Sequence, residues 1–415
     1  MRVLWITNAP FPEVSEHLKL NYSIKGWVFS SAHELIKHYP VVILGVASIY
    51  KGKQFKKIEI GSVQHFLIPQ KARNNATSSE NDIFWSQIKE LFNPDVVHIH
   101  GSEYPYSYSY IRACGNQKVV VSIQGLISVI ERYYLGGIAK STFLKSITIR
   151  DIFKLDNIFL QHLDLMRRAK YEISLFRSVN HVIGRTSWDK IHVTKINPEI
   201  KYHFCNETLR ESFYLKKWSI QKCRRYSIFI NQAYYPIKGL HILIKALPLI
   251  LKFYPDTIVY VSGNNFFTNR GWLINGYGRY INSLMNKLDV ENRFIFTGVL
   301  SEEEICRKYL ESHVFVCPSA IENSSNSIGE AQLLGVPCIA SYVGGTPDII
   351  KHEETGLLYR FEEFEMLAAN ICKIFSEDKL AMKLSENARN SAELRHNRKV
   401  NASELYKIYS KILSI

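Results

Sequence analysis

Short runs of apolar and β-branched residues alternate with helix-length amphipathic segments along almost the whole chain of 415 residues. In the first half, helices are predicted at 23–38 and over a long stretch at 126–177. Strands are predicted there at 3–7, 41–46, 63–68, 95–100, 119–123 and 181–184. Because strands that helices cover on both faces are apolar along their whole length, this rhythm predicts a parallel sheet wound on both faces.

The same rhythm restarts after a mixed, basic and aromatic segment at 206–225, which we interpret as a connection. Strands are predicted at 226–231, 257–261, 294–297, 314–317 and 337–340, with a helix at 238–252 and mostly helix after Gly356. The sequence therefore predicts an α/β protein with two Rossmann-like domains, at about 1–210 and 220–395. We expect the C-terminal helix, about 396–415, to pack back on the first domain. In such sheets ligands bind beyond the carboxyl ends of the strands, so the cleft between the two sheets is the expected site.

The chain carries a net charge of +14, which calls for an anionic partner or a solvated basic surface. Two stretches concentrate the cations: Lys140, Lys145, Arg150, Lys154, Arg167, Arg168 and Lys170, and then Lys216, Lys217, Lys222, Arg224 and Arg225. Either stretch is interpreted as a solvated face or as a peripheral contact with an anionic membrane. We expect no nucleic acid partner, because no zinc-finger spacing or RNA-binding aromatic motif accompanies the charge.

The seven cysteines are scattered, odd in number and without a C-x-x-C pair, which indicates a reducing compartment. The apolar start of the chain is too short for a signal sequence, and no run of about 18 apolar residues predicts a membrane span. We therefore expect a cytoplasmic protein, whose membrane contact would be peripheral at the inner face of the cytoplasmic membrane.

The segment 318–350 contains the most informative motif. A strand ends near Cys317, a loop of small polar residues follows, and a helix is predicted to begin near Asn326. Backbone N–H groups of such a loop, with the positive end of the helix dipole, suit an anionic diphosphate. Glu330, one turn into the helix, can accept hydrogen bonds from the two hydroxyls of a ribose, and Glu322 lies before the helix. The alternative is that Glu330 only complements the helix dipole.

Glu322 and Glu330, with seven residues between them and Gly344-Gly345 following, resemble the E-x7-E signature of retaining glycosyltransferases with the GT-B fold. The surrounding pattern Pro-Ser-x-x-Glu…Glu-Ala-x-x-x-Gly-x-Pro makes the resemblance specific. The resemblance covers the second domain best and the whole chain in outline. Within the family, this sequence is most similar to bacterial enzymes that build capsule, O-antigen or exopolysaccharide chains. The resemblance implies transfer of a sugar from a UDP-, GDP- or ADP-sugar to a glycan or lipid-linked acceptor, with no metal and no cofactor.

The resemblance also implies roles for individual residues of the second domain. Glu330 would bind the donor ribose, Glu322 would contact and align the transferred sugar, and Lys238 would hold the diphosphate and act in catalysis. The base would meet the backbone around Gly298. Backbone amides of the loop would bind the sugar and the phosphates, through Asn323, Ser324, Ser325, Asn326 and Ser327.

One cation of the family pattern is missing, because Gln232 stands where many members have an arginine. We expect Arg185, at the end of a first-domain strand, either to compensate for it at the diphosphate or to pair within its own turn, with Trp188 or Asp189. Elsewhere in the first domain, Gly26 is expected to permit close approach to the donor phosphate.

His98 and His100 share one face of a strand in the first domain. We expect His98 to be a core histidine with satisfied nitrogens, and His100 to face the cleft as a catalytic residue. A metal site at this pair is disfavoured, since no third ligand is near in the sequence.

Two other functions remain alternatives. One is a different enzyme on the same fold, either a nucleotide-sugar epimerase or a phosphorylase. The other is a non-catalytic protein that binds a nucleotide sugar. The complete set of Glu322, Glu330 and Lys238 favours the transferase.

Overall fold

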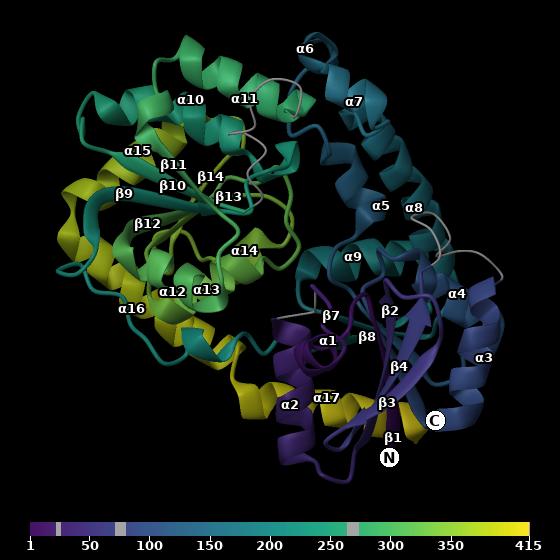
Figure 1. Cartoon of the computed structure of the whole chain (residues 1–415). Helices are drawn as coiled ribbons and strands as arrows, with labels where there is room; N and C mark the ends of the chain where they lie inside the picture. The colour runs from purple at the N-terminus through teal and green to yellow at the C-terminus, as the bar shows by residue number, and fades with distance from the viewer. Residues whose placement is uncertain (22–25, 71–79, 264–273, 415) are drawn as a thin grey trace. The chain divides into compact units, whose positions relative to one another are not determined.

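A computed structural model describes residues 1–21, 26–70, 80–263 and 274–414, with the side chains of residues 80 and 81 excepted. Contacts divide the chain into two compact units (Figure 1). Unit 1 comprises Met1–Val129, Met166–Leu209 and His396–Ile415, and unit 2 comprises Ile130–Leu165 and Arg210–Arg395. Each unit contains a mostly parallel sheet covered by helices, the predicted α/β class.

Unit 1 is built on an eight-stranded sheet in the order β3-β4-β2-β1-β5-β6-β7-β8. All neighbouring strands are parallel except β3, which runs antiparallel to β4. The strands are β1 (Arg2–Thr7), β2 (Ile43–Tyr50), β3 (Lys56–Ile60), β4 (Val63–Pro69), β5 (Val96–His100), β6 (Val119–Ser122), β7 (His181–Gly184) and β8 (Lys201–Phe204). The helices are α1 (Pro12–His17), α2 (Trp27–His38), α3 (Glu80–Phe92), α4 (Pro105–Cys114), α5 (Ile127–Ile130), the end of α8 (Ile158–Ser178), α9 (Ser187–Ile196) and α17 (Arg398–Leu413).

The two faces of this sheet bury two separate cores, because successive residues of a strand point to opposite faces. From β1, Val3 and Trp5 enter the core shared with α2 and α17, whereas Leu4 and Ile6 enter the core shared with α3, α4 and α8. The C-terminal helix α17 is fastened by Tyr409, which is fully buried. Its hydroxyl lies 2.9 Å from Nε1 of Trp5 and 2.6 Å from Nδ1 of His98.

Unit 2 is built on a six-stranded, fully parallel sheet in the order β11-β10-β9-β12-β13-β14. In Figure 1, α10 and α11 lie on one side of this sheet and α12 and α13 on the other. The strands are β9 (Arg224–Asn231), β10 (Ile258–Ser262), β11 (Phe294–Gly298), β12 (Ser312–Cys317), β13 (Cys338–Ser341) and β14 (Leu357–Tyr359). The helices include α6 (Lys140–Ser146), α7 (Ile149–Phe153), α10 (Leu240–Leu251), α11 (Gly276–Lys287), α12 (Glu302–Glu311), α13 (Asn326–Leu334), α14 (Thr346–Ile349), α15 (Phe364–Ser376) and α16 (Asp378–Arg395). Single 3-10 turns are η2 (Glu131–Tyr133), η3 (Glu211–Phe213), η4 (Pro236–Lys238) and η6 (Glu291–Arg293).

The observed units differ from the predicted first domain, 1–210, over residues 130–165. These residues belong to unit 2 because α6 and α7 pack on α11. The ring of Phe143 lies 6.4 Å from that of Tyr280, and Arg279 donates a hydrogen bond to the carbonyl of Ile147 at 3.3 Å. The predicted long helix at 126–177 is likewise divided into α5, α6, α7 and α8.

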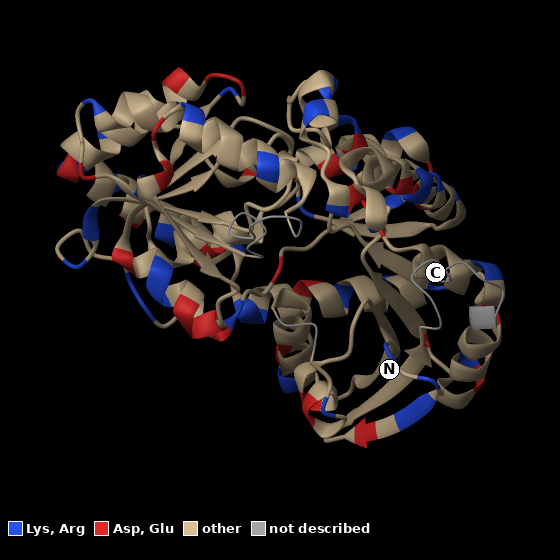
Figure 2. Ribbon diagram, turned by 45° about the horizontal axis from the view of Figure 1, so that its top comes forward, with Lys and Arg blue, Asp and Glu red and all other residues tan. Residues whose placement is uncertain are grey.

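Lys and Arg are spread over both units, with Asp and Glu among them (Figure 2). In the described parts of the chain, no helix combines the length and the apolar character needed to cross a bilayer.

Candidate donor site

The carboxyl ends of all six strands of unit 2 lie at the same edge of the sheet, because the strands are parallel and adjacent. Asn231, the last residue of β9, links two of its neighbours. Its Oδ1 accepts a hydrogen bond from the Ser262 hydroxyl at 2.6 Å, and its Nδ2 donates to the Ser327 hydroxyl at 3.2 Å. The predicted loop residue Ser327 is thereby tied to the sheet edge where a ligand is expected.

Helix α13 begins at Asn326, as predicted, and Ser325 is its N-cap residue. The Ser325 side chain makes no capping hydrogen bond, although its carbonyl accepts from the N–H groups of Ile328 and Gly329, both at 3.1 Å. The Tyr309 hydroxyl donates to the carbonyl of Ser327 at 3.0 Å and steadies the first turn. The helix therefore presents its positive end without a side-chain cap, an arrangement suited to an anion.

Lys238 and Glu322, both predicted site residues, meet at this edge. The ammonium of Lys238 donates to Oε1 of Glu322 at 2.6 Å. Burial acts to lower the pKa of Lys238, but the Glu322 carboxylate outweighs it, so the pKa lies above the usual lysine value. Lys238 is positioned by Gly239, whose φ of +72° brings the backbone against the carbonyl of Pro318. A side chain at Gly239 would collide with that carbonyl, which explains the glycine.

The loop that carries Glu322 is held from two sides. Oε1 of Glu322 also accepts from the Ser319 hydroxyl at 2.7 Å, and the Glu322 carbonyl accepts from the N–H of Gly345 at 3.0 Å. Gly344 has a φ of +52°, and a Cβ there would strike the same carbonyl. The Gly344-Gly345 pair thus allows its backbone to lie close to the Glu322 carbonyl, and this contact holds the loop in place.

Glu330 is paired with Arg210, a residue that the sequence analysis did not single out. Nε and Nη2 of Arg210 donate to Oε1 of Glu330 at 3.0 and 2.6 Å. Burial raises the pKa of Glu330, and the Arg210 guanidinium lowers it again in part. Arg210 lies in the segment interpreted as a connection, and only its place before the aromatic Phe213, over which its guanidinium lies, distinguishes it.

Gly298, at the end of β11, is at the same edge. Its carbonyl accepts from the N–H of Gly263 at 2.9 Å, its φ is +74°, and no atom of the described residues lies within 4 Å of the position that a Cβ would take. Gln232, which replaces the arginine of the family pattern, is exposed and has a φ of +55°. Its N–H donates to the carbonyl of Ser262 at 3.0 Å.

The three predicted site residues of unit 1 gather around Trp27. Gly26 is the N-cap residue of α2 and directly precedes Trp27. The His100 ring lies 5.6 Å from the Trp27 ring, and the Arg185 guanidinium lies 5.5 Å from its centre. Gly26 has a φ of +111°, and among the described residues no atom lies within 4 Å of the position that a Cβ would take.

His100 is buried, and neither of its ring nitrogens has a hydrogen-bond partner among the described residues. Burial, together with nearby His98 and Arg185, holds the pKa of His100 well below its usual value, so the ring is neutral. It lines a cavity of about 30 Å³, with room for one or two water molecules. Water there would satisfy the nitrogens, since buried polar atoms without partners are rare.

Arg185 makes an ion pair with Glu207, and its guanidinium also donates to the carbonyl of Ile123. Its charge is thus neutralised within unit 1. The alternative of pairing within its own turn is met in part. The backbone N–H of Arg185 donates to Asp189 at 3.0 Å, and the Asp189 carboxylate raises the pKa of Arg185 against the lowering effect of burial.

Both nitrogens of His98 are occupied, by the hydroxyls of Tyr409 and Ser122 at 2.6 Å each. His98 is thus the satisfied core histidine that the sequence predicted. Within the described ranges, no three His, Cys, Asp or Glu side chains converge in a way that could hold a metal ion.

The chain is similar to known proteins in sequence and in fold. Residues 211–391 match the sequence model of the family "Glycosyl transferases group 1". The putative glycosyltransferase YtcC of Bacillus subtilis is 29% identical over 203 residues, which are 48% of each chain. The chain spans about half the length of the first curated relatives it matches.

Two solved structures cover the chain almost completely. A sucrose-phosphate synthase from Thermosynechococcus elongatus covers 100% of this chain and 99% of its own, with a TM-score of 0.74 and 15% identity. The Anabaena protein Alr3699/HepE in complex with UDP-glucose covers 99% and 100%, with a TM-score of 0.66 and 15% identity. The chain therefore has the GT-B fold, and its residues 211–391 match the family model of group 1 glycosyl transferases.

Proposed function

We propose that this protein transfers a sugar from a nucleoside diphosphate sugar to an acceptor hydroxyl, with retention at the anomeric carbon. The observation that carries the proposal is the pairing of two carboxylates with two cations beside an uncapped helix start. Lys238 pairs with Glu322, and Arg210 pairs with Glu330, at the edge where α13 begins.

The diphosphate would lie at the start of α13, where backbone N–H groups of Ser324, Ser325, Asn326 and Ser327 can bind it. Lys238 would move part of its interaction from Glu322 to the phosphates and stabilise the charge that grows on them as the glycosidic bond breaks. Glu330, oriented by Arg210, would accept hydrogen bonds from the ribose. Glu322 would align the sugar, and the base would lie near Gly298.

The helix end and Lys238 would take over the role of a divalent cation, so we propose a metal-independent reaction that needs no cofactor. The leaving phosphate would assist deprotonation of the acceptor hydroxyl. Unit 1 would bind the acceptor, a glycan or lipid-linked sugar, with Gly26 near the bound ligand. The His100 ring is buried and neutral, so its expected catalytic role would require that its cavity open. Arg185, already paired with Glu207, would have a structural part.

The Anabaena protein was solved in complex with UDP-glucose, which makes a UDP-sugar the first donor to test. We place the reaction in the cytoplasm, in the assembly of a bacterial surface polysaccharide, because the motif is most similar to enzymes of that kind. The seven described cysteines form no disulfide, which is compatible with this compartment.

Calorimetric titration with UDP, GDP and ADP tests the donor site without knowledge of the acceptor. We expect one nucleotide to bind, and Lys238→Met to weaken it roughly tenfold or more because an ion pair with the diphosphate is lost. Lys252→Met, which removes an exposed lysine of the same unit, is the control and should bind like the unchanged protein. Absence of binding by all three nucleotides, or equal affinity of the Lys238 variant, would refute the proposed donor site.

A further inference from the structure

Helix α7 has its apolar side chains on the outside and its charged side chains on the inside. Its residues Ile149, Ile152 and Phe153 are 63%, 62% and 81% exposed, and they share one face because they are spaced i, i+3 and i+4. Leu155, just after the helix, is 74% exposed. These four residues are called the α7 patch here. The side of α7 that faces the protein carries charged residues instead.

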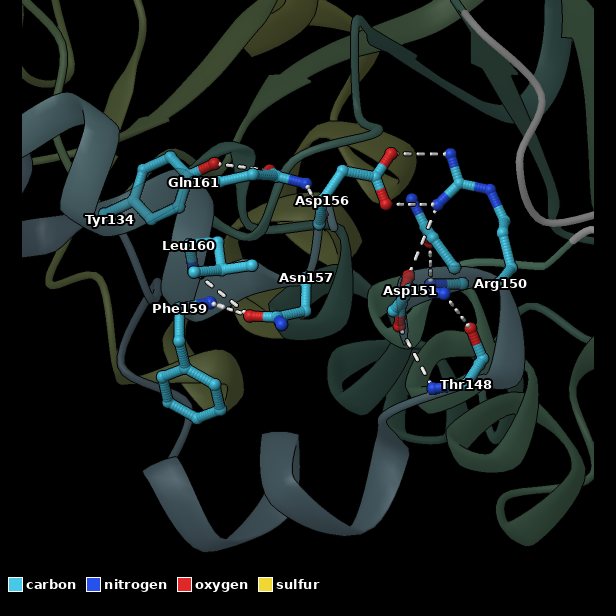
Figure 3. Close-up of polar contacts among 11 residues, drawn as sticks. Tyr134, Thr148, Arg150, Asp151, Asp156, Asn157, Phe159, Leu160 and Gln161 are labelled. Atoms are coloured by element: carbon cyan, nitrogen blue, oxygen red, sulfur yellow. Dashed lines mark hydrogen bonds and ion pairs between the residues drawn. The ribbon is translucent and has the colours of Figure 1, made fainter. Parts of the chain in front are cut away.

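The inward face of α7 is a closed polar network (Figure 3). Arg150 donates two hydrogen bonds to the two oxygens of Asp156, both at 2.9 Å, and lies 3.3 Å from Asp151. Asp151 is buried and accepts from the backbone N–H of Thr148 at 3.1 Å, while the Thr148 hydroxyl accepts from the N–H of Asp151 at 3.2 Å. The charged groups of this helix therefore hold its orientation, and its apolar face is left outside.

Contacts with α11 keep the α7 patch in this orientation. Gly276, the first residue of α11, packs so closely that a Cβ there would lie 2.9 Å from the Asp151 carboxylate and 3.2 Å from the carbonyl of Ser146. Leu155 has a φ of +48°, a backbone conformation that is unfavourable for leucine. An exposed leucine in such a turn contributes nothing to the core of unit 2, although it extends the apolar surface.

In the segment 140–156, which carries the α7 patch, the charged side chains that form no ion pair with a described residue are lysines. Lys140, Lys145 and Lys154 are exposed and form no ion pair with any residue that the structure describes. The acids of this segment, Asp151 and Asp156, are both paired with Arg150. An apolar surface with unpaired lysines around it fits the boundary of an anionic bilayer, where apolar side chains enter the acyl region and ammonium groups meet the headgroups.

We propose that the α7 patch inserts into the surface of a membrane that contains anionic lipid, and that Lys140, Lys145 and Lys154 bind its headgroups. A protein partner fits less well, because the isolated lysines would need a matching acidic surface whereas a bilayer supplies one without specific geometry. The inference goes beyond the proposed sugar transfer and does not require it.

Flotation of the full chain with vesicles tests this proposal. The unchanged protein should bind vesicles of phosphatidylcholine with phosphatidylglycerol and not vesicles of phosphatidylcholine alone. The double variant Ile152→Ser, Phe153→Ser should lower the vesicle partition coefficient roughly tenfold or more, because two inserted side chains are lost. Phe253→Ser, at another phenylalanine of unit 2 that is 74% exposed, should bind like the unchanged protein.

A second variant, Lys145→Gln with Lys154→Gln, should reduce binding most strongly at low salt. Equal vesicle binding of the Ile152, Phe153 variant and the unchanged protein would overturn the proposal. So would a dimer of the unchanged protein that this variant dissociates, with no vesicle binding by either, which would make the α7 patch an interface between copies. Nucleotide titration of the same variants should be unchanged, so failure here is distinct from failure of the donor site.

Discussion

At the scale of single residues, the candidate donor site consists of charges that already have partners. Glu330 is buried, and burial raises its pKa, so its ionised form depends on the guanidinium of Arg210. An ionised carboxylate only accepts hydrogen bonds, as a ribose diol requires, whereas a protonated one also donates. Arg210 is thus a positioning residue whose effect should depend on pH.

Replacement of Arg210 by Met should raise the pKa of Glu330 further. We expect nucleotide affinity near pH 7 to fall roughly tenfold or more, and to recover in part as the pH rises and Glu330 ionises. Titration calorimetry between pH 6 and 9 measures this. Arg307→Met, at an arginine of the same unit whose side chain is 65% exposed, is the control. Affinity that does not change with pH in the Arg210 variant would contradict this role for the arginine.

Sequence motifs predicted three charged residues of the candidate donor site, Glu322, Glu330 and Lys238, but not Arg210, the ion-pair partner of Glu330. Glu322 and Lys238 are 84 positions apart, and their meeting follows from the shared edge of a parallel sheet, which the alternation of strands and helices predicts. Arg210 could not be found in this way, because it lies before the first strand of unit 2 and has no motif around it. Its link to Glu330 depends on tertiary packing, as does the pairing of Arg185 with Glu207.

At the scale of elements, the loop before α13 is braced by a glycine. Gly344→Ala would push a methyl group against the Glu322 carbonyl, and we expect kcat/KM to fall roughly tenfold as the loop moves. Gly61→Ala is a matched control, since Gly61 has a similar φ of +59° but open space around it. Gly61→Ala should lose about 1 to 2 kcal/mol of stability from backbone strain alone, and Gly344→Ala should lose more because the clash with the Glu322 carbonyl adds to that strain. Equal activity of the two variants would mean that the position of the loop is not important.

Besides its apolar packing, helix α17 is held in unit 1 by the Tyr409 hydroxyl, which contacts both Trp5 and His98. Tyr409→Phe leaves the Trp5 N–H and a nitrogen of His98 without their partner, so we expect a loss of about 2 to 4 kcal/mol in the free energy of unfolding. Tyr406→Phe keeps the ring, which stacks on Tyr39 with the ring centres 4.2 Å apart. This variant should change the free energy of unfolding by less than about 0.5 kcal/mol. Urea denaturation compares them, and equal losses would show that this hydroxyl does not stabilise the helix.

The sequence pattern indicated every described strand except β3, β8 and β14, and each omission has a physical cause. Strand β8, Lys201–Phe204, is a four-residue edge strand in which only His203 is buried, so it shows no apolar run. Strand β3, Lys56–Ile60, is an exposed antiparallel edge strand with charged residues, and it lacks the apolar run by which buried strands are recognised. Strand β14 has only three residues, too few for any period to show. Helix α7 has an apolar face that would predict burial, but the paired Arg150 and Asp151 occupy the inside instead.

At the scale of the whole molecule, buried neutral histidines should make the fold sensitive to acid. Burial lowers the pKa of His65 to about 4 and that of His98 to about 3. Because the unfolded chain takes up these protons near pH 6.5, their contribution to stability is complete above that pH. It is lost as the pH falls toward 4 and 3, by about 1.4 kcal/mol per pH unit for each histidine.

His65→Phe isolates this effect, because both His65 nitrogens lack partners among the described residues and a phenyl ring fits a buried apolar position. The variant should be more stable than the unchanged protein at pH 7 by about 1 to 3 kcal/mol, and by about 2 kcal/mol more at pH 5. Urea denaturation at the two pH values measures both differences. A stability difference that is the same at pH 5 and pH 7 would show that His65 does not titrate in this range.

We propose that unit 2 contains the donor site of a sugar transferase. An assay for release of nucleoside diphosphate tests this with a panel of UDP-, GDP- and ADP-sugars, lipid-linked acceptors and EDTA throughout. It compares the unchanged protein with Glu330→Gln and Lys238→Met. We expect turnover of one donor, unaffected by EDTA and lost in both variants. Turnover that EDTA abolishes, or that both variants retain, would contradict the proposal, and nucleotide binding without any turnover would identify a non-catalytic binding protein.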